Sequence, residues 1–338
     1  MRRYVFTALI IITIVFSLVV MRSIAPFVFP SYLIYILISL FFYFLFSRID
    51  FSILTIFWKH FYVVSIVLLL ITLIIGQASR GVIRWIPIGN LAFQPSELIR
   101  PFLFVFFAVY MKNKMNLKKY IGSIFLFGIA FLLIVAQPSL GVAVVTASGF
   151  IGMLISSPVN KKYILISSVL FIVMAPFLFF FLHPYQKDRI QSLFNSGNES
   201  AHYNSVQSVI SVGSGGFWGR GLGRGVQTQL AFLPERHTDF AYASISEELG
   251  FFGAIIVLVL LFLLYLIIIK IFDTRIKSEE RVFVSGIIFS LIFQTFVHVG
   301  MNLGFLPITG LTLPLISIGG SSLLATMISL GILLGIMS

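Results

Sequence analysis

The stretch "PERHTDFAYASISEELGFFGAIIVLVLLFLLYLIII", residues 234–269, joins a polar beginning rich in carboxylates to a long apolar run. The run has roughly the 20 residues that an α-helix needs to cross the hydrocarbon core of a bilayer. A spanning segment has to be helical, because lipid offers no partner for an unpaired backbone N–H or C=O group. The stretch therefore predicts a transmembrane helix with ionisable side chains gathered at its beginning.

The rest of the chain has the same apolar character. Of its 338 residues, 59% are hydrophobic and only 10% are charged, and the mean hydropathy is +1.07. Soluble domains are only about half apolar. We therefore predict an all-α polytopic membrane protein with about ten transmembrane helices in a single domain over residues 1–338. The spans are expected near residues 5–22, 27–46, 58–76, 92–111, 121–136, 140–157, 163–182, 239–269, 283–304 and 312–336.

Charge sets the expected orientation of these spans. The first one opens with Arg2 and Arg3, as a signal peptide does, but Arg22 follows it and no small-residue cleavage site precedes Pro26. We interpret it as a retained helix. Lys and Arg collect in every second connection, which the positive-inside rule places in the cytoplasm together with both termini. The net charge of +12 then suits anionic lipid at the inner face, and no nucleic-acid partner is needed. Absence of Cys excludes disulfides and thiolate metal sites.

One connection is much longer than the others. It covers about residues 183–238, between the seventh and eighth predicted helices, and it is polar and Gly-rich. The alternation of connections places it outside the cytoplasm, together with the shorter segments 77–90 and 137–141. A long connection in a compact domain is usually functional or disordered. We therefore expect the function to lie on the outer face.

The first polar motif within a span is "FQPSELIRPF", residues 93–102. Pro95 favours the start of a helix, and Glu97 and Arg100 are i,i+3 neighbours that can pair on one helical face. An ionisable residue within a span is costly, so a functional role is the default hypothesis. A structural ion pair near the membrane surface is the alternative. Arg100 also has the geometry to hold a phosphate.

The second motif is "GSGGFWGRGLGRG", residues 213–225. Its glycines allow positive φ angles and close approach to a ligand, while Arg220 and Arg224 supply charge for an anion. The Walker pattern G-x-x-x-x-G-K-[ST] is absent, and no predicted strand precedes the glycines, so we expect no nucleotide. A flexible loop is the alternative interpretation.

The carboxylates of the opening stretch form the third motif. The helix is predicted to begin near Thr238, which puts Asp239 in its first turn. There the helix dipole favours the ionised carboxylate, whereas burial and neighbouring carboxylates oppose it, and a poised carboxylate can act as a general base. Glu247 lies two turns further along on about the same face, beside Glu248. Helix capping and a polar contact between spans are the alternative.

The last motif is "MNLGFLPITGLTLPLISIGGSS", residues 301–322, in which Pro307 and Pro314 interrupt membrane spans. Broken helices are tolerated where they line a cavity or are buried in protein, and kinks for packing are the alternative. His298 and Asn302 are either hydrogen-bonding groups of the core or residues of a site.

Together these motifs resemble the SEDS family (shape, elongation, division and sporulation), which includes RodA and FtsW. The similarity covers most of the chain after residue 75 and rests on "RWIPIGNLAFQPSELIRP", "QPSLG", the segment from "YNSVQSV" to "EELGFFG", and "LPITGLTLPLISIGGSS". It implies a peptidoglycan glycosyltransferase of the bacterial cytoplasmic membrane that polymerises lipid II. It also implies contact with membrane lipid and undecaprenyl-diphosphate-linked glycan, and a class B penicillin-binding protein as partner.

The resemblance also suggests roles for individual residues. The family's essential outer-loop aspartate matches Asp239, and the pair of its fourth helix matches Glu97 and Arg100, with Trp85 as the tryptophan before them. We assign the other candidates as follows: Arg220, Arg224 and His237 to substrate or diphosphate binding, Glu247, Glu248, Gln207 and Ser321 to supporting roles, and Glu97 and Asp239 to a divalent cation, Mg or Mn.

This chain departs from the family pattern in the same motifs. Arg100 stands where the family commonly has Lys, which keeps the charge and changes its geometry. Ser139 replaces an acid and Val142 a threonine in the family's usual "QPDLGT", so any role of that acid is absent or relocated.

Two other classes of function stay open at the level of sequence. Ten spans with intramembrane charges also suit a lipid II flippase, although alternating access requires polar groups reachable from both sides. A noncatalytic scaffold for a penicillin-binding protein is the other alternative. The sequence is compatible with elongation, division or sporulation.

Overall fold

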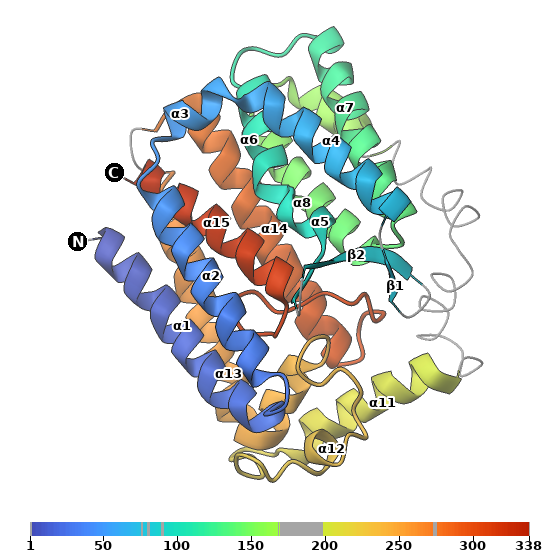
Figure 1. Ribbon diagram of the computed structural model, residues 1–338. Helices are drawn as coiled ribbons and strands as arrows, with labels where there is room; N and C mark the ends of the chain where they lie inside the picture. The colour runs from blue at the N-terminus through green and yellow to red at the C-terminus, as the bar shows by residue number, and fades with distance from the viewer. Residues whose placement is uncertain are drawn as a thin grey trace. The chain divides into compact units, whose positions relative to one another are not determined.

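The computed structural model describes residues 2–75, 77–79, 82–88, 91–167, 169, 199–272 and 276–337 (Figure 1). The chain forms two compact units. Unit 1 consists of Met1–Leu37, Pro184–Ile267 and Ile292–Leu323, and unit 2 of Ile38–His183, Ile268–Leu291 and Leu324–Ser338. This division does not test the prediction of a single domain, because the chain passes repeatedly from one unit to the other.

Unit 1 is built from helices that come from three distant parts of the chain. They are α1 (Arg2–Ile24), the beginning of α2 (Phe29–Ser47), α11 (Glu199–Ser214), α12 (Val226–Gln229), most of α13 (Ala241–Ile269), the end of α14 (Ser278–Asn302) and the beginning of α15 (Gly320–Ile336). A small apolar cluster packs the connections of this unit against α11 and α13. It contains Leu233, Phe240, Ala243 and Ile308, with Val212 of α11 packed against it.

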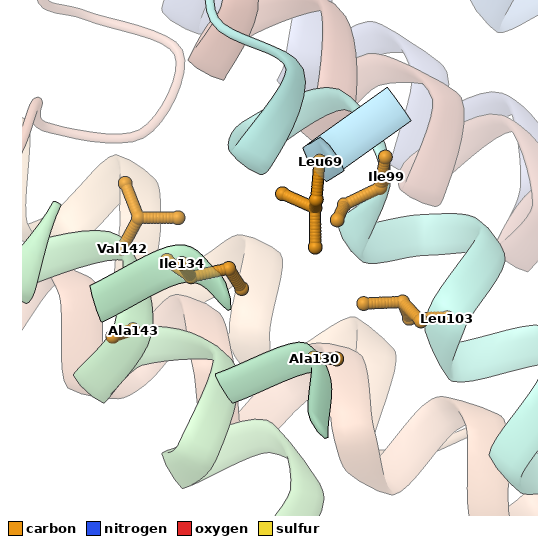
Figure 2. Packing of buried hydrophobic residues seen from close by; sticks show 7 residues of the cluster. All are labelled: Leu69, Ile99, Leu103, Ala130, Ile134, Val142 and Ala143. Carbon is orange, nitrogen blue, oxygen red and sulfur yellow. The ribbon is translucent and has the colours of Figure 1, made fainter. Parts of the chain in front are cut away.

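Unit 2 contains the remaining parts of α2, α13, α14 and α15 and a group of helices continuous in sequence. These are α3 (Phe51–Ile56), α4 (Trp58–Ile75), α5 (Pro95–Leu98), α6 (Arg100–Tyr110), α7 (Leu117–Ala136) and α8 (Leu140–Ser156). Their buried core includes the apolar residues in Figure 2: Leu69, Ile99, Leu103, Ala130, Ile134, Val142 and Ala143. Val142, which stands where the family has threonine, is therefore a core residue.

A small antiparallel sheet connects α4 to α5 in unit 2. Its strands are β1 (Gln77–Ser79), β2 (Val82–Ile88) and β3 (Leu91–Phe93), in the order β1-β2-β3. Trp85 lies opposite Gln77, and Ile86 lies opposite Phe93. The sequence predicts only a connection over residues 77–90, so the strands are an addition.

The helices of the described residues agree with a membrane-spanning fold. Five are long and apolar enough to cross a bilayer, namely Arg3–Ile24, Phe29–Ser47, Leu117–Ala136, Ala241–Ile269 and Ser278–Asn302. Three shorter apolar helices are Trp58–Ile74, Leu140–Ser156 and Gly320–Ile336. The all-α polytopic class is confirmed. The count of ten stays a prediction, since most of the expected seventh span, 163–182, lies outside the described residues.

Several predicted boundaries differ from the structure. The span expected over 312–336 begins only at Gly320, as helix α15. The helix expected from Thr238 begins at Ala241, so Asp239 precedes it. The span expected over 92–111 consists of the end of β3, the short helix α5, a turn at Ile99 and α6. Of the loop expected over 183–238, the first part lies outside the described residues, and residues 199–214 form helix α11.

Candidate active site

Helix α13 is broken near its beginning. Gly250 has φ 67° and ψ −162°, which lies outside the helical region and is accessible almost only to glycine. The break leaves main-chain groups on both sides without partners inside the helix. The glycine loop, residues 215–225, supplies them. Arg220 N and Gly221 N donate to the carbonyls of Glu247 and Glu248 at 2.9 Å each, and Phe251 N and Phe252 N donate to the carbonyls of Gly216 and Phe217 at 2.8 and 3.4 Å.

Such close approach of two backbones explains why glycines stand at the contact. A Cβ atom added to Gly219 would meet the carbonyl of Glu248, and one added to Gly250 would meet the amide nitrogen of Gly219. The loop is thus held against α13 by its main chain. This arrangement does not support the alternative of a flexible loop over these residues.

Glu247 is completely buried and caps the short helix α12. Its Oε1 accepts from Gln227 N at 2.8 Å, and its Oε2 accepts from Thr228 N at 2.9 Å and Thr228 Oγ1 at 2.6 Å. A carboxylate at a helix beginning satisfies N–H groups that have no partner within the helix. Glu247 therefore supports the fold of unit 1, and its supporting role in the site stays a prediction.

Glu248 is also fully buried and connects three segments. Its Oε2 accepts from Ser23 Oγ, at the end of α1, at 2.6 Å, and its Oε1 accepts from Gln229 Nε2 at 2.8 Å. The same Gln229 amide also donates to the carbonyl of Ser23 at 3.1 Å. The two adjacent carboxylates thus hold α1, α12 and α13 together.

Asp239 lies in a turn that precedes α13, and it is half-buried. Thr238 N and Phe240 N both donate to the carbonyl of Glu235, at 3.1 and 3.2 Å, which closes a turn before the helix begins. Glu235 itself has a left-handed φ of 51°. Helix α13 therefore starts three residues later than the sequence suggests.

Asn302, the last residue of α14, fixes this turn relative to α13. Its Nδ2 donates to the carbonyls of Asp239 at 3.0 Å and His298 at 2.7 Å, while its Oδ1 accepts from Ala243 N at 2.9 Å. Ser208 Oγ of α11 donates to the carbonyl of Asn302 at 2.9 Å. Asn302 thus caps the first turn of α13 and sets the position of Asp239 through its main chain.

His237 and Arg236 hold the same turn from the other side. The carbonyl of His237 accepts from Ile318 N at 2.8 Å, and its ring lies edge-on to Phe27, with 6.0 Å between the ring centroids. Arg236 Nε donates to the carbonyl of Ile24 at 3.1 Å, and its guanidinium lies over the Phe27 ring at 5.5 Å. The segment after α1 is therefore part of the candidate site.

The two arginines of the glycine loop have exposed side chains. Arg220 Nε donates to the carbonyl of Ser214 at 3.3 Å. Their acidic neighbours Glu247 and Glu248 are buried behind the loop. The surface of the loop is consequently cationic, which agrees with a contact to anions.

The other two supporting residues of unit 1 are less informative. Gln207 lies on α11, and its Oε1 is buried without a hydrogen-bond partner among the described residues. Ser321 is buried in the first turn of α15. The supporting roles of both residues stay predictions.

Unit 2 contains the predicted pair of the fourth helix. Glu97 and Arg100 are only 6% and 3% exposed, and their charges interact across the turn between α5 and α6. Trp85 is half-buried on β2. These residues were predicted to contribute to the same site as Asp239, but they belong to the other unit and are described separately.

Ser139, which replaces the family's usual acid, takes part in the same polar region of unit 2. Gln94 Nε2 donates to Ser139 Oγ at 2.7 Å and to Ser96 Oγ at 3.1 Å. All three side chains are buried. The serine hydroxyl thus accepts a hydrogen bond at the start of α8, where a carboxylate would also serve.

A metal site formed by protein side chains alone does not emerge in the part of the chain that the structure describes. There, no group of three or more His, Cys, Asp or Glu side chains is placed to hold an ion. The predicted ligands Glu97 and Asp239 lie in different units.

From the sequence, Asn302 and His298 could be either core or site residues, and no role was predicted for Arg236. His298 Nδ1 lies 2.7 Å from the carbonyl of Leu311, so both α14 side chains are hydrogen-bonding groups of the core. The signal that could have singled out Asn302 is an amide at the end of an apolar helix, since burying an amide requires partners. Arg236 stands within the carboxylate motif itself.

The comparisons with known proteins agree with these motifs. The family model for FtsW, RodA and SpoVE, described as "Cell cycle protein", matches residues 2–338. The chain belongs to this family. The SEDS resemblance is therefore confirmed, and with its apolar helices this member of the FtsW/RodA/SpoVE family is a multi-pass membrane protein.

Curated relatives of the FtsW/RodA/SpoVE chain carry enzyme names. The peptidoglycan glycosyltransferase MrdB of Escherichia coli K12 is 36% identical over 283 residues, which cover 82% of this chain and 76% of MrdB. The probable peptidoglycan glycosyltransferase FtsW of Buchnera aphidicola subsp. Baizongia pistaciae is 36% identical over 321 residues, covering 90% of this chain and 82% of that protein.

Solved structures show the same fold. One describes the structural coordination of polymerization and crosslinking by a peptidoglycan synthase complex. Its matching chain has a TM-score of 0.86 at 26% identity, covering 98% of this chain and 96% of that chain. The crystal structure of the rod shape determining protein RodA of Thermus thermophilus has a TM-score of 0.74 at 26% identity, with 98% and 95% covered.

Proposed function

We propose that this protein is a peptidoglycan glycosyltransferase that polymerises lipid II into β-1,4-linked glycan strands. The observation that carries the proposal is the family match over residues 2–338, with relatives at 36% identity that are named peptidoglycan glycosyltransferases. Its place is the bacterial cytoplasmic membrane, with both termini in the cytoplasm and the Asp239 turn on the outer face. The positive-inside rule supports this orientation.

In the proposed reaction Asp239 is the general base. Its carboxylate takes the proton from the C4 hydroxyl of the acceptor's GlcNAc while that oxygen attacks the anomeric carbon of the donor's MurNAc. The bond from this carbon to the undecaprenyl diphosphate breaks, and the electron pair leaves with the diphosphate. A single displacement inverts the anomeric carbon, so an α-linked donor gives a β-1,4 bond. The fixed turn around Asp239 supports this role, because a base has to be held within reach of its proton.

Departure of the diphosphate concentrates negative charge on phosphate oxygens. Cations placed there stabilise the transition state more than the ground state. Arg220 and Arg224 support this step with exposed guanidinium groups, and Arg100 is the third proposed cation. The remaining proposed contacts to the substrate are Glu97, Trp85 and His237.

A divalent cation stays a prediction. Mg²⁺ is commonly held by one or two carboxylates together with phosphates of the substrate, so a cluster of protein ligands is not required. Glu97 or Asp239 would supply such a carboxylate. In the proposed reaction, residues of this chain bind, orient and deprotonate the sugar, and no step requires the ion.

We also propose a class B penicillin-binding protein as partner. Support comes from the structural neighbour, which belongs to a peptidoglycan synthase complex that coordinates polymerization and crosslinking. Such a partner would crosslink the strands that this protein polymerises. The lipid tails of both substrates explain why a transferase is built almost entirely from membrane-spanning helices.

The test compares wild type with Asp239→Asn, purified together with the partner and supplied with labelled lipid II. Loss of a general base is expected to lower kcat by roughly 100-fold to 10,000-fold with little change in KM. Asp50→Asn, which removes an exposed carboxylate outside the site, serves as the matched control. Polymerisation at the wild-type rate by a folded Asp239→Asn protein would refute the assignment.

The same variant separates the alternative functions. A lipid II flippase would expose labelled precursor on the far leaflet of vesicles equally well with Asp239→Asn. A noncatalytic scaffold would support normal wall synthesis in cells that carry only this variant. If the wild-type complex does not polymerise lipid II, the first result would identify a flippase and the second a scaffold. Either one would refute the proposed transferase activity.

A further inference from the structure

Aromatic and cationic side chains gather where the glycine loop meets α13. They form what we call the aromatic–arginine patch: Phe217, Trp218, Arg220, Leu222 and Arg224 of the loop, and Phe251 and Phe252 of α13. All of these side chains are exposed, Trp218 by 82% and Phe217 by 68%. Exposed aromatic groups of this size in water are unfavourable, since burial of one such side chain stabilises by about 1.5–3 kcal/mol. Apolar side chains are also exposed along the membrane-spanning helices, and the patch differs from them by the two arginines beside its rings.

Ring contacts and main-chain bonds fix the place of the patch. The rings of Trp218 and Phe252 lie 4.9 Å apart between centroids, and those of Phe217 and Phe251 lie 5.8 Å apart. Phe251 N and Phe252 N donate to carbonyls of the loop at 2.8 and 3.4 Å. The loop aromatics therefore lie at the first residues of the apolar run that follows the break of α13.

The depth of these residues follows from the span itself. After the break at Gly250, residues 251–269 are uncharged and reach roughly the length that crosses the hydrocarbon core. The first of them therefore lie at the boundary between hydrocarbon and headgroups. Trp residues are enriched at that boundary, because the ring is amphipathic. The Trp218 ring lies tilted against that of Phe252 and therefore at about the same depth.

Charge at the patch favours phosphate. The side chains of Arg220 and Arg224 are exposed, whereas Glu247 and Glu248, whose carbonyls bond to the loop, are buried and hydrogen-bonded within unit 1. The exposed charge beside the aromatic rings is therefore positive. Arg binds phosphate well through its planar set of N–H donors.

We propose that the aromatic–arginine patch docks on the phospholipid headgroups of the leaflet at the Phe251 end of α13. Phe217 and Trp218 insert beside the span, and the guanidinium groups of Arg220 and Arg224 contact lipid phosphate. Under the proposed orientation this is the outer leaflet. The contact goes beyond glycosyl transfer, since it forms with bilayer phospholipid alone. The same contact would keep the main chain of the glycine loop, which covers Glu247 and Glu248, at the depth of the phosphate groups. A lipid-linked diphosphate lies at that depth.

The test uses the full chain in nanodiscs of phosphatidylcholine and phosphatidylglycerol that contain no lipid-linked saccharide. A Trp58→Phe/Trp85→Phe protein keeps Trp218 as the sole tryptophan, because the chain has three. We expect its fluorescence to be quenched more by lipids brominated near the headgroup than by lipids brominated near the chain end. Quenching by aqueous iodide is expected to be weak. A protein that keeps only Trp58, on α4, is the matched reference.

Opposite quenching would overturn the proposal. If iodide quenches Trp218 strongly and brominated lipids do not, the patch faces water and suits a soluble protein instead. The second measurement is the preference for spin-labelled phosphatidylglycerol over phosphatidylcholine, in wild type and in Arg220→Gln/Arg224→Gln. Each arginine near anionic lipid is expected to contribute roughly a fivefold preference. An unchanged preference in the double variant would exclude the phosphate contact. Neither readout depends on polymerisation, so the proposed function can fail independently.

Discussion

Two neighbouring parts of unit 1 carry carboxylates and are anchored in different ways. The acid pair, Glu247 and Glu248, is buried and bound through its side-chain oxygens to α12 and to the end of α1. The turn with Asp239 is bonded through its main chain to Asn302 and to the segment before α15. The carbonyl of Asp239 accepts from Asn302, and that of His237 accepts from Ile318.

The carboxylates of one stretch of sequence are therefore held in different ways, and the difference offers a test of the chemical role that we propose for Asp239. In the acid pair, the identity of the side chain maintains the packing of several segments. In the turn, the main-chain bonds persist when the side chain at position 239 changes. Replacement of Glu247 should therefore affect folding first, and Asp239→Asn should affect the reaction first.

The largest effect that tests this comparison is expected from Glu247→Ala. The substitution leaves Gln227 N, Thr228 N and Thr228 Oγ1 without their acceptor in a buried place. Each buried unsatisfied group costs about 1–3 kcal/mol, so we expect a loss of about 3 kcal/mol or more. Thermal unfolding in detergent, followed by circular dichroism, measures it.

A control from another helix beginning accompanies this variant. Glu279 lies in the first turn of α14 and is partly exposed, and Glu279→Ala should cost less than about 1 kcal/mol. Equal unfolding midpoints of Glu247→Ala and wild type would show that the acid pair does not support the fold. The contrast with Asp239 would then disappear.

The second prediction concerns the contact between the glycine loop and α13. Gly250→Ala introduces a Cβ at φ 67°, ψ −162° and against the main chain of the loop. We expect a loss of about 1–3 kcal/mol from the backbone conformation alone. Gly213→Ala is the matched control, because Gly213 is helical and its added Cβ would meet nothing within 4 Å. Gly213→Ala should stabilise the protein by about 0.5–1 kcal/mol. A higher unfolding midpoint for Gly250→Ala than for Gly213→Ala would contradict the contact between the glycine loop and α13.

The apolar runs allowed much of the membrane fold to be predicted. Length and composition alone place α1, α2, α7 and α13 within a few residues of their observed bounds, because the hydrocarbon core imposes them. For Glu247 and Glu248 the sequence left helix capping and a polar contact between spans open beside a role in the site, and the supporting role that the resemblance suggested stays a prediction.

What the sequence does not reveal depends on contacts between distant residues. The start of α13 is set by Asn302, some 60 residues away, through bonds to Asp239 O and Ala243 N. The main-chain hydrogen bonds around Gly250 likewise join two segments that are separate in sequence. Local residue propensities do not predict such bonds. The strands β1–β3 form by pairing between short segments, which propensity predicts poorly.

One missed element had a local signal. Helix α11 exposes apolar side chains at Tyr203, Val206 and Ile210, a spacing of three and four residues that is typical of an amphipathic helix. The polar and Gly-rich character of the whole connection concealed this pattern. A window of the helix's own length would have detected it.

The third prediction sharpens the comparison at Asn302. Asn302→Asp keeps an acceptor for Ala243 N but places an oxygen against the carbonyls of Asp239 and His298. We expect a folded protein with kcat lowered about tenfold, since the lost hydrogen bond to the Asp239 carbonyl is worth about 1 kcal/mol and the displaced turn adds to it. Asn302→Leu removes both functions and should reduce stability as well.

Kinetics with labelled lipid II and unfolding midpoints are measured on both variants. A positioning role through Asp239 predicts a fall in kcat with KM unchanged for Asn302→Asp, whereas a purely structural role lowers only the unfolding midpoint. Wild-type kcat in Asn302→Asp would show that the main-chain bond does not set the position of the base.

The smallest effect is expected at Asp50, an exposed counterpart of Glu247. Asp50 also caps a helix, since its Oδ1 accepts from Ser52 N at 2.9 Å at the start of α3. This bond, with a smaller contribution from Lys277, holds the pKa of the Asp50 carboxyl below its ordinary value. A lowered pKa in the folded state stabilises the protein above the unfolded pKa of about 3.9, and the contribution is lost as pH falls through the folded value. Asp50→Asn keeps an oxygen acceptor and removes the charge, so its unfolding midpoint should lie slightly below that of wild type at neutral pH and meet it in acid. The effect should be small because water already solvates the exposed carboxylate at position 50, which leaves its hydrogen bond little net value. A loss of stability as large as that of Glu247→Ala would mean that burial does not distinguish the two caps.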